Sequence, residues 1–237
     1  SLSLSLSLSL SLSLSLCLLE WELLGDTDQQ LGRFDRVVVS TPAPQAQHLL
    51  TEVPSLRERV REVTLAPCWA VMLGLRDKTS LPFGGAFVND DTSPLSWVCK
   101  QSSKAPSTTT TSTTTDSTQQ GEAWVLHGKA SWSATHQDDQ PEKVAAELTS
   151  AFKKLVASMG QAPNTLLTSS EVDKVLSLVV TPAIHAHLWR YAIATPPLNV
   201  GYMWDPERGV GVCGDWCNGS KVEGAFMSGY LLAKAML

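Results

Sequence analysis

The sequence lacks the features that mark several classes of protein. It holds 18 Lys and Arg against 23 Asp and Glu in 237 residues, with no basic stripe suited to a phosphate backbone. Nucleic acid is therefore not an expected partner. No apolar run reaches the roughly 18 residues that a membrane-spanning helix needs, and no basic segment precedes an apolar one as in a signal peptide. We expect no membrane span and favour a soluble intracellular protein, in the cytoplasm or a plastid.

Cysteine and histidine are too sparse to suggest a metal or disulfide framework. The five cysteines are scattered, and the closest pair, Cys213 and Cys217, is spaced C-x-x-x-C rather than C-x-x-C. We interpret them as reduced thiols. His185 and His187 form an H-x-H pair, but no third ligand accompanies it. No metal site is expected.

Two stretches have compositions that do not encode a packed fold. Residues 1–16 are eight copies of Ser-Leu, the translation expected of a dinucleotide repeat, although their period of two would also suit a strand with one apolar face. We expect the segment 1–19 to lie outside the native fold. The Ser/Thr tract at 102–121 has too few apolar groups to offset the entropy of ordering it, which predicts a disordered loop.

The remaining sequence predicts an α/β fold that contains an α+β block. The apolar run Val37–Val39 leads through Thr41-Pro42 into a helix, as a parallel strand covered on both faces would. Little helix separates the next strands, so they predict a mostly antiparallel sheet. These strands are expected at 66–77, 83–90, 95–101 and 122–133. A helix from Pro141, a strand at 183–194 and a strand at 209–213 before the last helix complete the pattern.

The order of these elements predicts one domain interrupted by another. Residues 20–60 and 195–237 are expected to form a partial Rossmann-type domain, and residues 61–194 a substrate domain. A cleft between two such layers is a common place for a small ligand.

The C-terminal segment carries the most specific local signal. Ser220 and Glu223 have capping-box spacing, which predicts a helix from about Ser220 with its free N–H groups directed back at Gly214-Asp215. Free N–H groups and the helix dipole favour an electron-rich oxygen at such a place. One flank of this helix is nearly bare, because it consists of Gly224, Ala225, Ser228 and Gly229.

Two interpretations of this segment stay open. Asp215 accepting from polyol hydroxyls, with a planar ring against the bare flank, describes a site for the ribityl chain and isoalloxazine of a flavin. Alternatively, the helix packs tightly on a sheet and Asp215 is a local cap. A redox pair or a covalent flavin anchor at Cys213 and Cys217 is an alternative to reduced thiols.

The same segment resembles a known family. "CGDWCNGSKVEGAFMSGYLLA" looks like the C-terminal FAD-contacting segment of the flavin amine oxidase-like group, and more closely that of the renalase family. Further segments resemble successive renalase-like segments in the same order, namely "VVVSTPAPQAQHLL", "APCWAVMLGL", "FGGAFVNDDTSPLSWVCKQSSK", "EAWVLHGKASWSATH" and "HLWRYAIA". The resemblance implies a two-domain FAD-oxidoreductase fold like that of p-hydroxybenzoate hydroxylase. It also implies oxidation of misreduced dihydro-NAD(P) to NAD(P)⁺, with O₂ as acceptor and H₂O₂ as product.

The resemblance assigns cofactor-binding positions residue by residue. Gly214 and Asp215 match the family's turn at the ribityl chain. The helix start that faces the flavin pyrimidine edge is matched by Lys221, Val222, Glu223 and Gly224. Thr41 and Pro42, after the first apolar strand, are the remaining cofactor-binding candidates. Family members begin with a βαβ unit whose G-x-G-x-x-G glycines admit the pyrophosphate, and Ser-Leu repeats stand in its place here. We therefore expect a chain without that N-terminal dinucleotide-binding unit.

Substrate-side candidates are expected on the sheet of the inserted domain. Flat indole and imidazole rings suit a planar nicotinamide or adenine. The candidates are Asn89, Trp97, Trp124, His127 and His187, with Trp132 and Trp189 on the same predicted sheet. The alternative for each Trp, and for His127, is a structural place in the core. No catalytic general base is expected, because hydride transfer to a flavin does not require one.

Three functional hypotheses follow. The leading one is a renalase-like FAD oxidoreductase acting on a reduced nicotinamide dinucleotide and O₂. The second is a flavin amine oxidase, which would need an aromatic cage for a neutral amine. The third is a non-catalytic fragment that binds no FAD.

Overall fold

The computed structural model describes residues 11–15, 20–25, 29–104, 121–160 and 167–237. Most of the Ser-Leu repeat and residues 105–120 of the Ser/Thr tract lie outside the described residues. The predictions made for these residues are therefore not tested by the structure. The chain divides into two compact units, one of Ser1–Ala66 with Tyr191–Leu237 and one of Pro67–Arg190. Each unit has its own hydrophobic core.

The first unit is built on a three-stranded sheet in the order β10-β11-β4. Strand β4 (Val37–Val39) runs parallel to β11 (Val210–Val212), and β10 (Met203–Asp205) runs antiparallel to β11. The strands predicted at 37–39 and 209–213 are therefore confirmed. Their parallel register places Val39 beside Val212, so both strands end at the same edge of the sheet.

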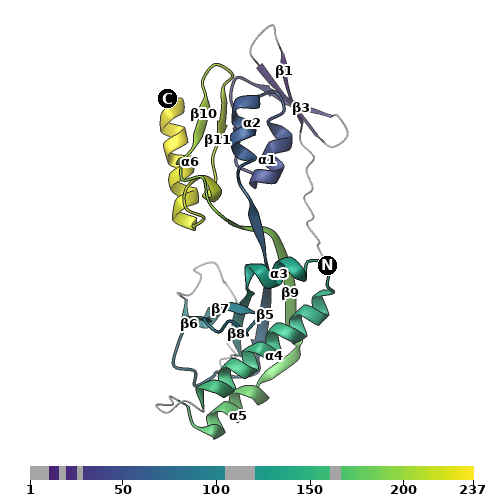
Figure 1. Ribbon diagram of the computed structural model, residues 1–237, viewed down its shortest axis with the longest axis vertical. Helices are drawn as coiled ribbons and strands as arrows, with labels where there is room; N and C mark the ends of the chain where they lie inside the picture. Colours follow the sequence, from purple (N-terminus) through teal and green to yellow (C-terminus); the bar gives the residue numbers. More distant parts are fainter. Residues whose placement is uncertain (1–10, 16–19, 26–28, 105–120, 161–166) are drawn as a thin grey trace, which may run out of the picture. The chain divides into compact units, whose positions relative to one another are not determined.

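Helices cover the two faces of this sheet. On one face, α1 (Ala43–Leu49) and α2 (Pro54–Val60) share a core with Val39, Val210 and Val212. On the other face lies α6 (Val222–Met236), whose Leu232 packs where Gly211 has no side chain; an added Cβ there would lie 2.8 Å from the Leu232 methyl carbons. Figure 1 shows α6 on one side of β10 and β11 and the two short helices on the other.

The prediction that the first apolar strand is covered on both faces is wrong for one of its residues. Val39 is buried, but Val38 is 46% exposed. Strand β4 is at the edge of the described sheet, and Val38 pairs with Gly211 of β11. Both residues are on the face of the sheet that carries α6, but α6 packs against Gly211. The helix therefore shields the central strand and leaves the edge strand open on that face.

Part of the Ser-Leu repeat forms a strand, in contrast to the expectation that this segment lies outside the fold. β1 (Ser11–Ser15) pairs antiparallel with β2 (Glu20–Leu24), which pairs antiparallel with β3 (Gln30–Phe34). A period of two suits a pleated strand, which explains why the repeat can pair. Trp21 of β2 is fully buried and donates its indole N–H to the Arg208 carbonyl (2.6 Å), which joins this small sheet to the rest of the first unit.

The second unit is built on a five-stranded sheet in the order β6-β7-β8-β5-β9. The pairs β6–β7, β7–β8 and β5–β8 are antiparallel, which confirms the predicted mostly antiparallel sheet. The strands are β5 (Leu65–Leu75), β6 (Gly85–Phe87), β7 (Leu95–Lys100), β8 (Glu122–Gly128) and β9 (Val179–Ala194). A short 3-10 turn, Gln101–Ser103, follows β7, at the start of the loop predicted for 102–121.

Two of the predicted strands end earlier than expected. The strand predicted at 83–90 stops at Phe87, because the Asp90 carboxylate accepts from the Thr92 N–H (2.9 Å) and turns the chain. The strand predicted at 122–133 stops at Gly128, and α3 (Ala130–Thr135) follows it. The Ser133 hydroxyl, buried in α3, accepts from the backbone N–H of Trp69 (3.0 Å), so a long-range bond overrides the alternating local pattern.

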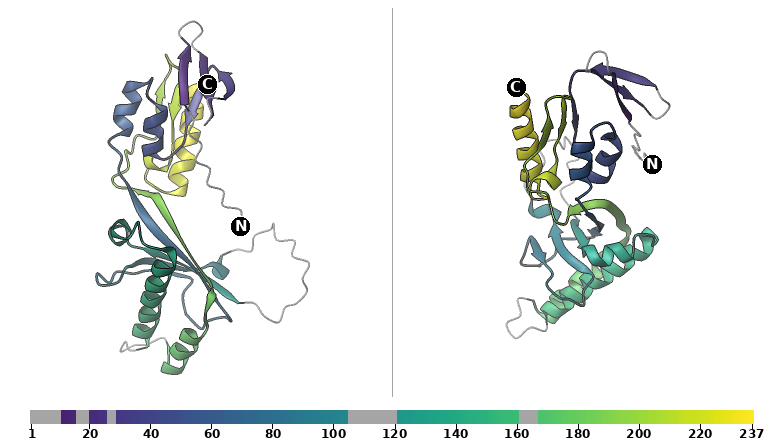
Figure 2. Two further views of the ribbon diagram at one scale, coloured as in Figure 1. Left: turned by 90° about the vertical axis from the view of Figure 1, so that its right-hand side faces the viewer. Right: turned by 45° about the horizontal axis from the view of Figure 1, so that its top comes forward.

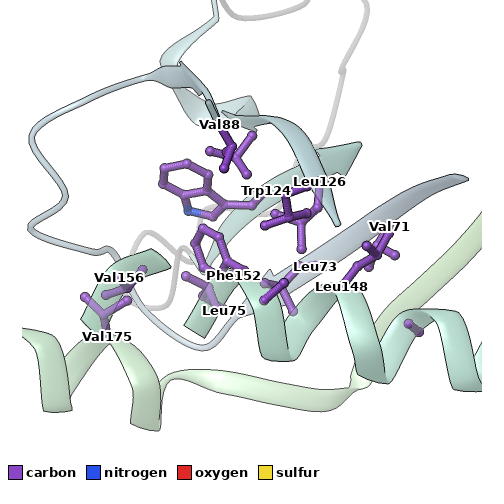
Figure 3. Close-up of a cluster of buried hydrophobic side chains, with 14 of the residues drawn as sticks. Val71, Leu73, Leu75, Val88, Trp124, Leu126, Leu148, Phe152, Val156 and Val175 are labelled. Carbon is purple, nitrogen blue, oxygen red and sulfur yellow. The ribbon is translucent and has the colours of Figure 1, made fainter. Parts of the chain in front are cut away.

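The core of the second unit lies between the sheet and α4 (Pro141–Met159). The predicted helix from Pro141 is confirmed, and its Leu148, Phe152 and Val156 are fully buried. Figure 3 shows Phe152 directed at Trp124 and Leu148 near Leu73, and Figure 2 shows α4 running along one face of the sheet. Helix α5 (Ser169–Ser177) follows, with a capping box of Thr168 and Glu171.

Candidate functional site

The cofactor-side candidates meet at the carboxyl ends of two parallel strands. Thr41-Pro42 follows β4, and Gly214-Asp215 follows β11. The Cys213 N–H donates to the Val39 carbonyl (3.1 Å), which continues the parallel pairing up to the turn. In open α/β sheets, ligands bind outside the carboxyl ends of the strands. The structure therefore brings together, at such an edge, two pairs of residues that are far apart in the sequence.

Trp216 joins these two turns. It lies in the 3-10 turn η2 (Asp215–Cys217), is 2% exposed, and donates its indole N–H to the Thr41 carbonyl (3.1 Å). Gly214 has no side chain because a Cβ there would lie 2.7 Å from the indole Nε1. The sequence analysis did not single out Trp216, although it stands inside the G-D-W-C block. Nothing local in the sequence indicates that its partner is Thr41.

The predicted capping box at the last helix is wrong. Helix α6 starts at Val222 with Lys221 as its N-cap, and no side chain caps it. Ser220 has a positive φ of 51°, its N–H donates to the Asp215 carbonyl (2.9 Å), and its hydroxyl is directed at the Ala194 carbonyl (3.4 Å). Ser220 therefore belongs to the turn that begins at Asp215, and it does not cap α6 as the local pattern predicted.

The absence of a cap leaves donors open at the start of α6. The first backbone N–H of this helix with a helical acceptor is that of Ala225, which donates to Lys221 (2.9 Å). Those of Val222, Glu223 and Gly224 have no acceptor among the described residues, as expected for a first turn. A hollow of about 230 Å³ lies beside this turn. It is lined by Asn218, Gly219, Lys221, Glu223, Gly224 and Met227.

The small residues of α6 fall into two groups, of which one packs against the protein itself and the other is open. A Cβ on Gly224 would lie 1.9 Å from the Asn218 carbonyl oxygen, and the buried Ser228 hydroxyl accepts from the Gly214 N–H (3.1 Å). These two residues are small because the protein's own turn packs against them, which corrects the interpretation that the whole flank was cleared for a ligand. Ala225 is exposed, and a Cβ on Gly229 would meet nothing within 4 Å.

Two oxygen groups at this edge have no partner among the described residues. The Thr41 hydroxyl is buried without a hydrogen bond, which is costly in a folded protein. The carboxylate of the half-buried Asp215 accepts from no described residue. Together with the open N–H groups of α6, they offer acceptors for hydroxyl groups and donors for an electron-rich oxygen. This donor and acceptor set fits the ribityl chain and pyrimidine edge of a flavin.

The two cysteines that flank the turn are inert thiols in this structure. Cys213 and Cys217 are buried and free. Burial, with a smaller contribution from Cys213, raises the pKa of Cys217 to about 12, and burial also raises the pKa of Cys213. Because only the thiolate is a strong nucleophile, the raised pKa values disfavour reaction of both groups at neutral pH. These findings favour the interpretation as reduced thiols.

In the second unit, Trp97 and His127 form a pair on neighbouring strands. They are directly opposite each other in the β7–β8 register, and their ring centroids are 5.0 Å apart. Their strand neighbours Val98 and Leu126 point into the core, so the pair lies on the face of the sheet opposite α4. Burial, and then the charge of Lys104, lower the pKa of His127, so its imidazole is neutral at pH 7.

The other substrate-side candidates are not gathered with this pair. Trp124 is fully buried in the core and donates its indole N–H to Glu122 (2.6 Å). His187 is exposed on β9, where its ring meets that of Trp189 at 4.7 Å. Asn89 is exposed beside the turn that ends β6.

A literal match to the dinucleotide fingerprint was missed in the sequence. Residues 209–214 read G-V-G-V-C-G, but Gly211 lies inside β11 and a 3-10 turn follows Gly214. A Cβ on Gly209, at φ 67°, would lie 2.5 Å from the Asp35 carbonyl oxygen. At all three glycines, other protein atoms occupy the space of a side chain. The pattern is not followed directly by an α-helix, so it lacks the helix N-terminus that a dinucleotide-binding fingerprint requires.

Neither a metal cluster nor a membrane helix is found in the part of the chain that the structure describes. No group of three or more His, Cys, Asp or Glu is placed there to hold a metal ion. No described helix is long and apolar enough to cross a membrane.

Comparison with known proteins establishes the family. The model of the flavin-containing amine oxidoreductases matches residues 22–237, so the chain belongs to this family. Membership implies a flavin cofactor, which agrees with the donor and acceptor set at the strand ends.

Solved structures with the same fold are FAD-dependent amine oxidases. Cyclohexylamine oxidase from Brevibacterium oxydans IH-35A is 14% identical with a TM-score of 0.57, over 96% of this chain and 46% of that one. A variant of putrescine oxidase with redesigned cofactor binding is 12% identical with a TM-score of 0.55, over 97% of this chain and 48% of that one. These likenesses confirm the α/β FAD-oxidoreductase fold. The chain spans less than half the length of either structure.

Proposed function

We propose that this chain is the flavin-facing part of a renalase-like oxidoreductase, which oxidises misreduced dihydro-NAD(P) to NAD(P)⁺ with O₂ and releases H₂O₂. Family membership and the renalase-like sequence blocks support the proposal. The observation that carries the cofactor part is the uncapped start of α6, open to a hollow lined by Asn218, Gly219 and Lys221 among others.

The cofactor residues have separate tasks in this proposal. The Asp215 carboxylate and the Thr41 hydroxyl hold ribityl hydroxyls, and Pro42 and Gly214 shape the two turns. The open N–H groups of Val222, Glu223 and Gly224 hold the oxygen-bearing edge of the ring, and Lys221 adds positive charge there. Negative charge that develops at this edge on reduction is stabilised by these donors and by the helix dipole.

FAD, when bound, supplies the acceptor for the hydride of the dihydronicotinamide and transfers the two electrons to O₂. The substrate loses one hydride and becomes the aromatic nicotinamide cation. O₂ gains two electrons and two protons and becomes H₂O₂. No protein side chain has to remove a proton from the substrate, so the protein's task is to orient the donor carbon and exclude water.

We assign the substrate ring to the face of the sheet that carries Trp97 and His127. An indole offers a flat surface, and the neutral imidazole of His127 offers one donor and one acceptor to a carboxamide. His187 and Asn89 are further candidates. Trp124 belongs to the proposal only as support, since its ring is enclosed by the core.

An amine oxidase activity is the second candidate, because the family and the solved structures of this fold point to it. A neutral amine requires an aromatic cage above the flavin. Trp97 and His127 form an aromatic pair on the sheet of the second unit, and they are our candidates for contact with the amine. The same flavin chemistry then applies to a carbon–nitrogen bond instead of a dihydronicotinamide.

One experiment separates these hypotheses. The purified chain is titrated with FAD, and binding is followed by flavin fluorescence and visible absorbance. The complex is then mixed anaerobically with the 2- and 6-dihydro isomers of NADH, or with cyclohexylamine or putrescine. Bleaching by the dihydronicotinamides alone supports the proposal, and bleaching by the amines alone supports the second candidate. Absence of FAD binding contradicts both and supports the non-catalytic hypothesis.

A further inference from the structure

Helix α6 carries a row of exposed apolar side chains on the side opposite its buried face. Val222, Phe226 and Tyr230 are 91%, 69% and 50% exposed, whereas Ser228 and Leu232 are buried. Residues four apart lie on one side of a helix, and the exposed Ala233 continues the row. We name Val222, Phe226, Tyr230 and Ala233 the α6 stripe. A contiguous apolar surface of this kind marks an interaction site.

Two rings of the α6 stripe lie parallel to each other. The rings of Phe226 and Tyr230 are parallel within 8°, with centroids 6.3 Å apart, and the Lys234 ammonium lies 5.6 Å from the Tyr230 ring centre. Next to the rings, Gly229 has open space where a side chain would be. A second helix can therefore approach the backbone at the middle of the stripe and pack its own aromatic rings beside these.

The charges along the stripe indicate which helix this is. Glu223 and Lys234 are eleven residues apart, close to three helical turns, so both lie along the same edge of the stripe. Neither forms a salt bridge with a described residue. When two identical helices pair antiparallel about a twofold axis, each edge of one helix lies against the same edge of the other, and the residues run in opposite directions along it. Glu223 then faces Lys234 of the partner subunit, and Phe226 faces Tyr230 of the partner subunit.

We propose that the α6 stripe is a homodimer interface, in which two copies of α6 pair antiparallel about a twofold axis that crosses the stripe midway between the levels of Phe226 and Tyr230. One register allows both salt bridges and both aromatic contacts, because the midpoint between Glu223 and Lys234 and the midpoint between Phe226 and Tyr230 fall in the same helical turn. One helix pair is a small interface, so the dimer is weak, with a Kd of roughly 1–100 μM. This inference does not rest on the proposed cofactor or activity.

Sedimentation velocity of the full chain without FAD, over a concentration series around that range, tests the pairing. The wild-type protein shifts from monomer to dimer as its concentration rises. Phe226→Glu abolishes the shift, because it places two carboxylates in the apolar centre. Glu223→Lys and Lys234→Glu each replace two attractions by two repulsions and weaken the dimer by about tenfold.

The double variant Glu223→Lys/Lys234→Glu is the decisive sample, since it recreates both ion pairs in reverse. It restores the wild-type Kd to within about threefold. Lys154→Glu, on α4 of the second unit, is the matched charge control and leaves the Kd unchanged. Circular dichroism verifies that each variant is folded. A wild-type chain that stays monomeric, an association that survives Phe226→Glu, or a double variant no tighter than the single ones overturns the proposal.

Discussion

The indole N–H of Trp216 donates a hydrogen bond to the carbonyl of Thr41, 3.1 Å away across 175 sequence positions. This bond joins the turn after β4 to the turn after β11. Its donor belongs to the loop that carries Asp215, and its acceptor belongs to Thr41, whose buried hydroxyl has no partner in the described part of the chain. The geometry of the candidate flavin site therefore depends on one tryptophan that does not itself line the hollow beside α6.

Replacing Trp216 by Phe tests this dependence. The smaller phenyl ring leaves a void at this buried site and the Thr41 carbonyl loses its donor, so the free energy of unfolding falls by about 2–4 kcal/mol. FAD binding weakens further, because the two turns are no longer fixed to each other. Urea denaturation and FAD titration measure the two effects. Trp189→Phe, at an exposed indole, is the control; equal FAD affinity in both variants contradicts the positioning role.

We expect substitution by Ala to have opposite effects on stability at two glycines of α6. Gly224→Ala places a methyl group 1.9 Å from the Asn218 carbonyl oxygen, so the turn or the helix start must move, and stability falls by roughly 2 kcal/mol or more. Gly229→Ala meets open space and gains helix propensity, which stabilises by up to about 1 kcal/mol. Thermal unfolding of both variants checks the sign. Two variants of equal stability would show that the turn does not pack on Gly224.

Cys217 is expected to resist alkylation in the native state. Burial raises the pKa of its thiol to about 12, so almost no thiolate exists at pH 7.5. Iodoacetamide labelling with mass spectrometry detects modification of Cys213 and Cys217 only after urea is added. Rapid native labelling of Cys217 would contradict the burial of this turn and reopen the hypothesis of a covalent anchor.

His127 makes stability depend on pH. Burial first, and the charge of Lys104 second, lower the pKa of His127 below the 6.5 of an exposed histidine. The unfolded chain then binds more protons than the native state near pH 6, so this stabilisation is present above about pH 6.5 and is lost as the pH falls. Urea midpoints at pH 7.5 and 5.5 measure the loss. It is smaller in His127→Gln, and an unchanged pH dependence in that variant would refute the assignment.

Local patterns predicted the elements whose apolar residues recur at the period of the helix or strand that buries them. Helix α4 follows from the spacing of Leu148, Phe152 and Val156, and β9 follows from strict alternation around Ala186, which is buried while His185 and His187 are exposed. The prediction of Gly214 and Asp215 rested on the local pattern of a strand, a glycine turn and a helix, and on a resemblance; both residues lie at the end of β11. Their role in binding remains a proposal.

The misjudged features depend on specific contacts that hydrophobic periodicity and capping patterns do not encode. Ser220 bonds to the Asp215 turn rather than capping α6, and Ser133 bonds to Trp69 and holds α3 where a strand was predicted. The small size of Gly224 is explained by the Asn218 carbonyl, which no sequence pattern indicates. A single sequence records residue types but not these partners, so such positions are the ones where local rules give way to tertiary structure.

The most direct test of the account is FAD titration of the Val222→Pro variant beside the wild-type chain, followed by flavin fluorescence. Proline is compatible with the first residue of a helix, so the substitution removes one open N–H donor and keeps α6. The account predicts that the wild-type chain binds FAD, and that Val222→Pro and Asp215→Ala each weaken binding by about tenfold. Equal FAD affinity in all three proteins, or no binding by any of them, would contradict a flavin at the start of α6.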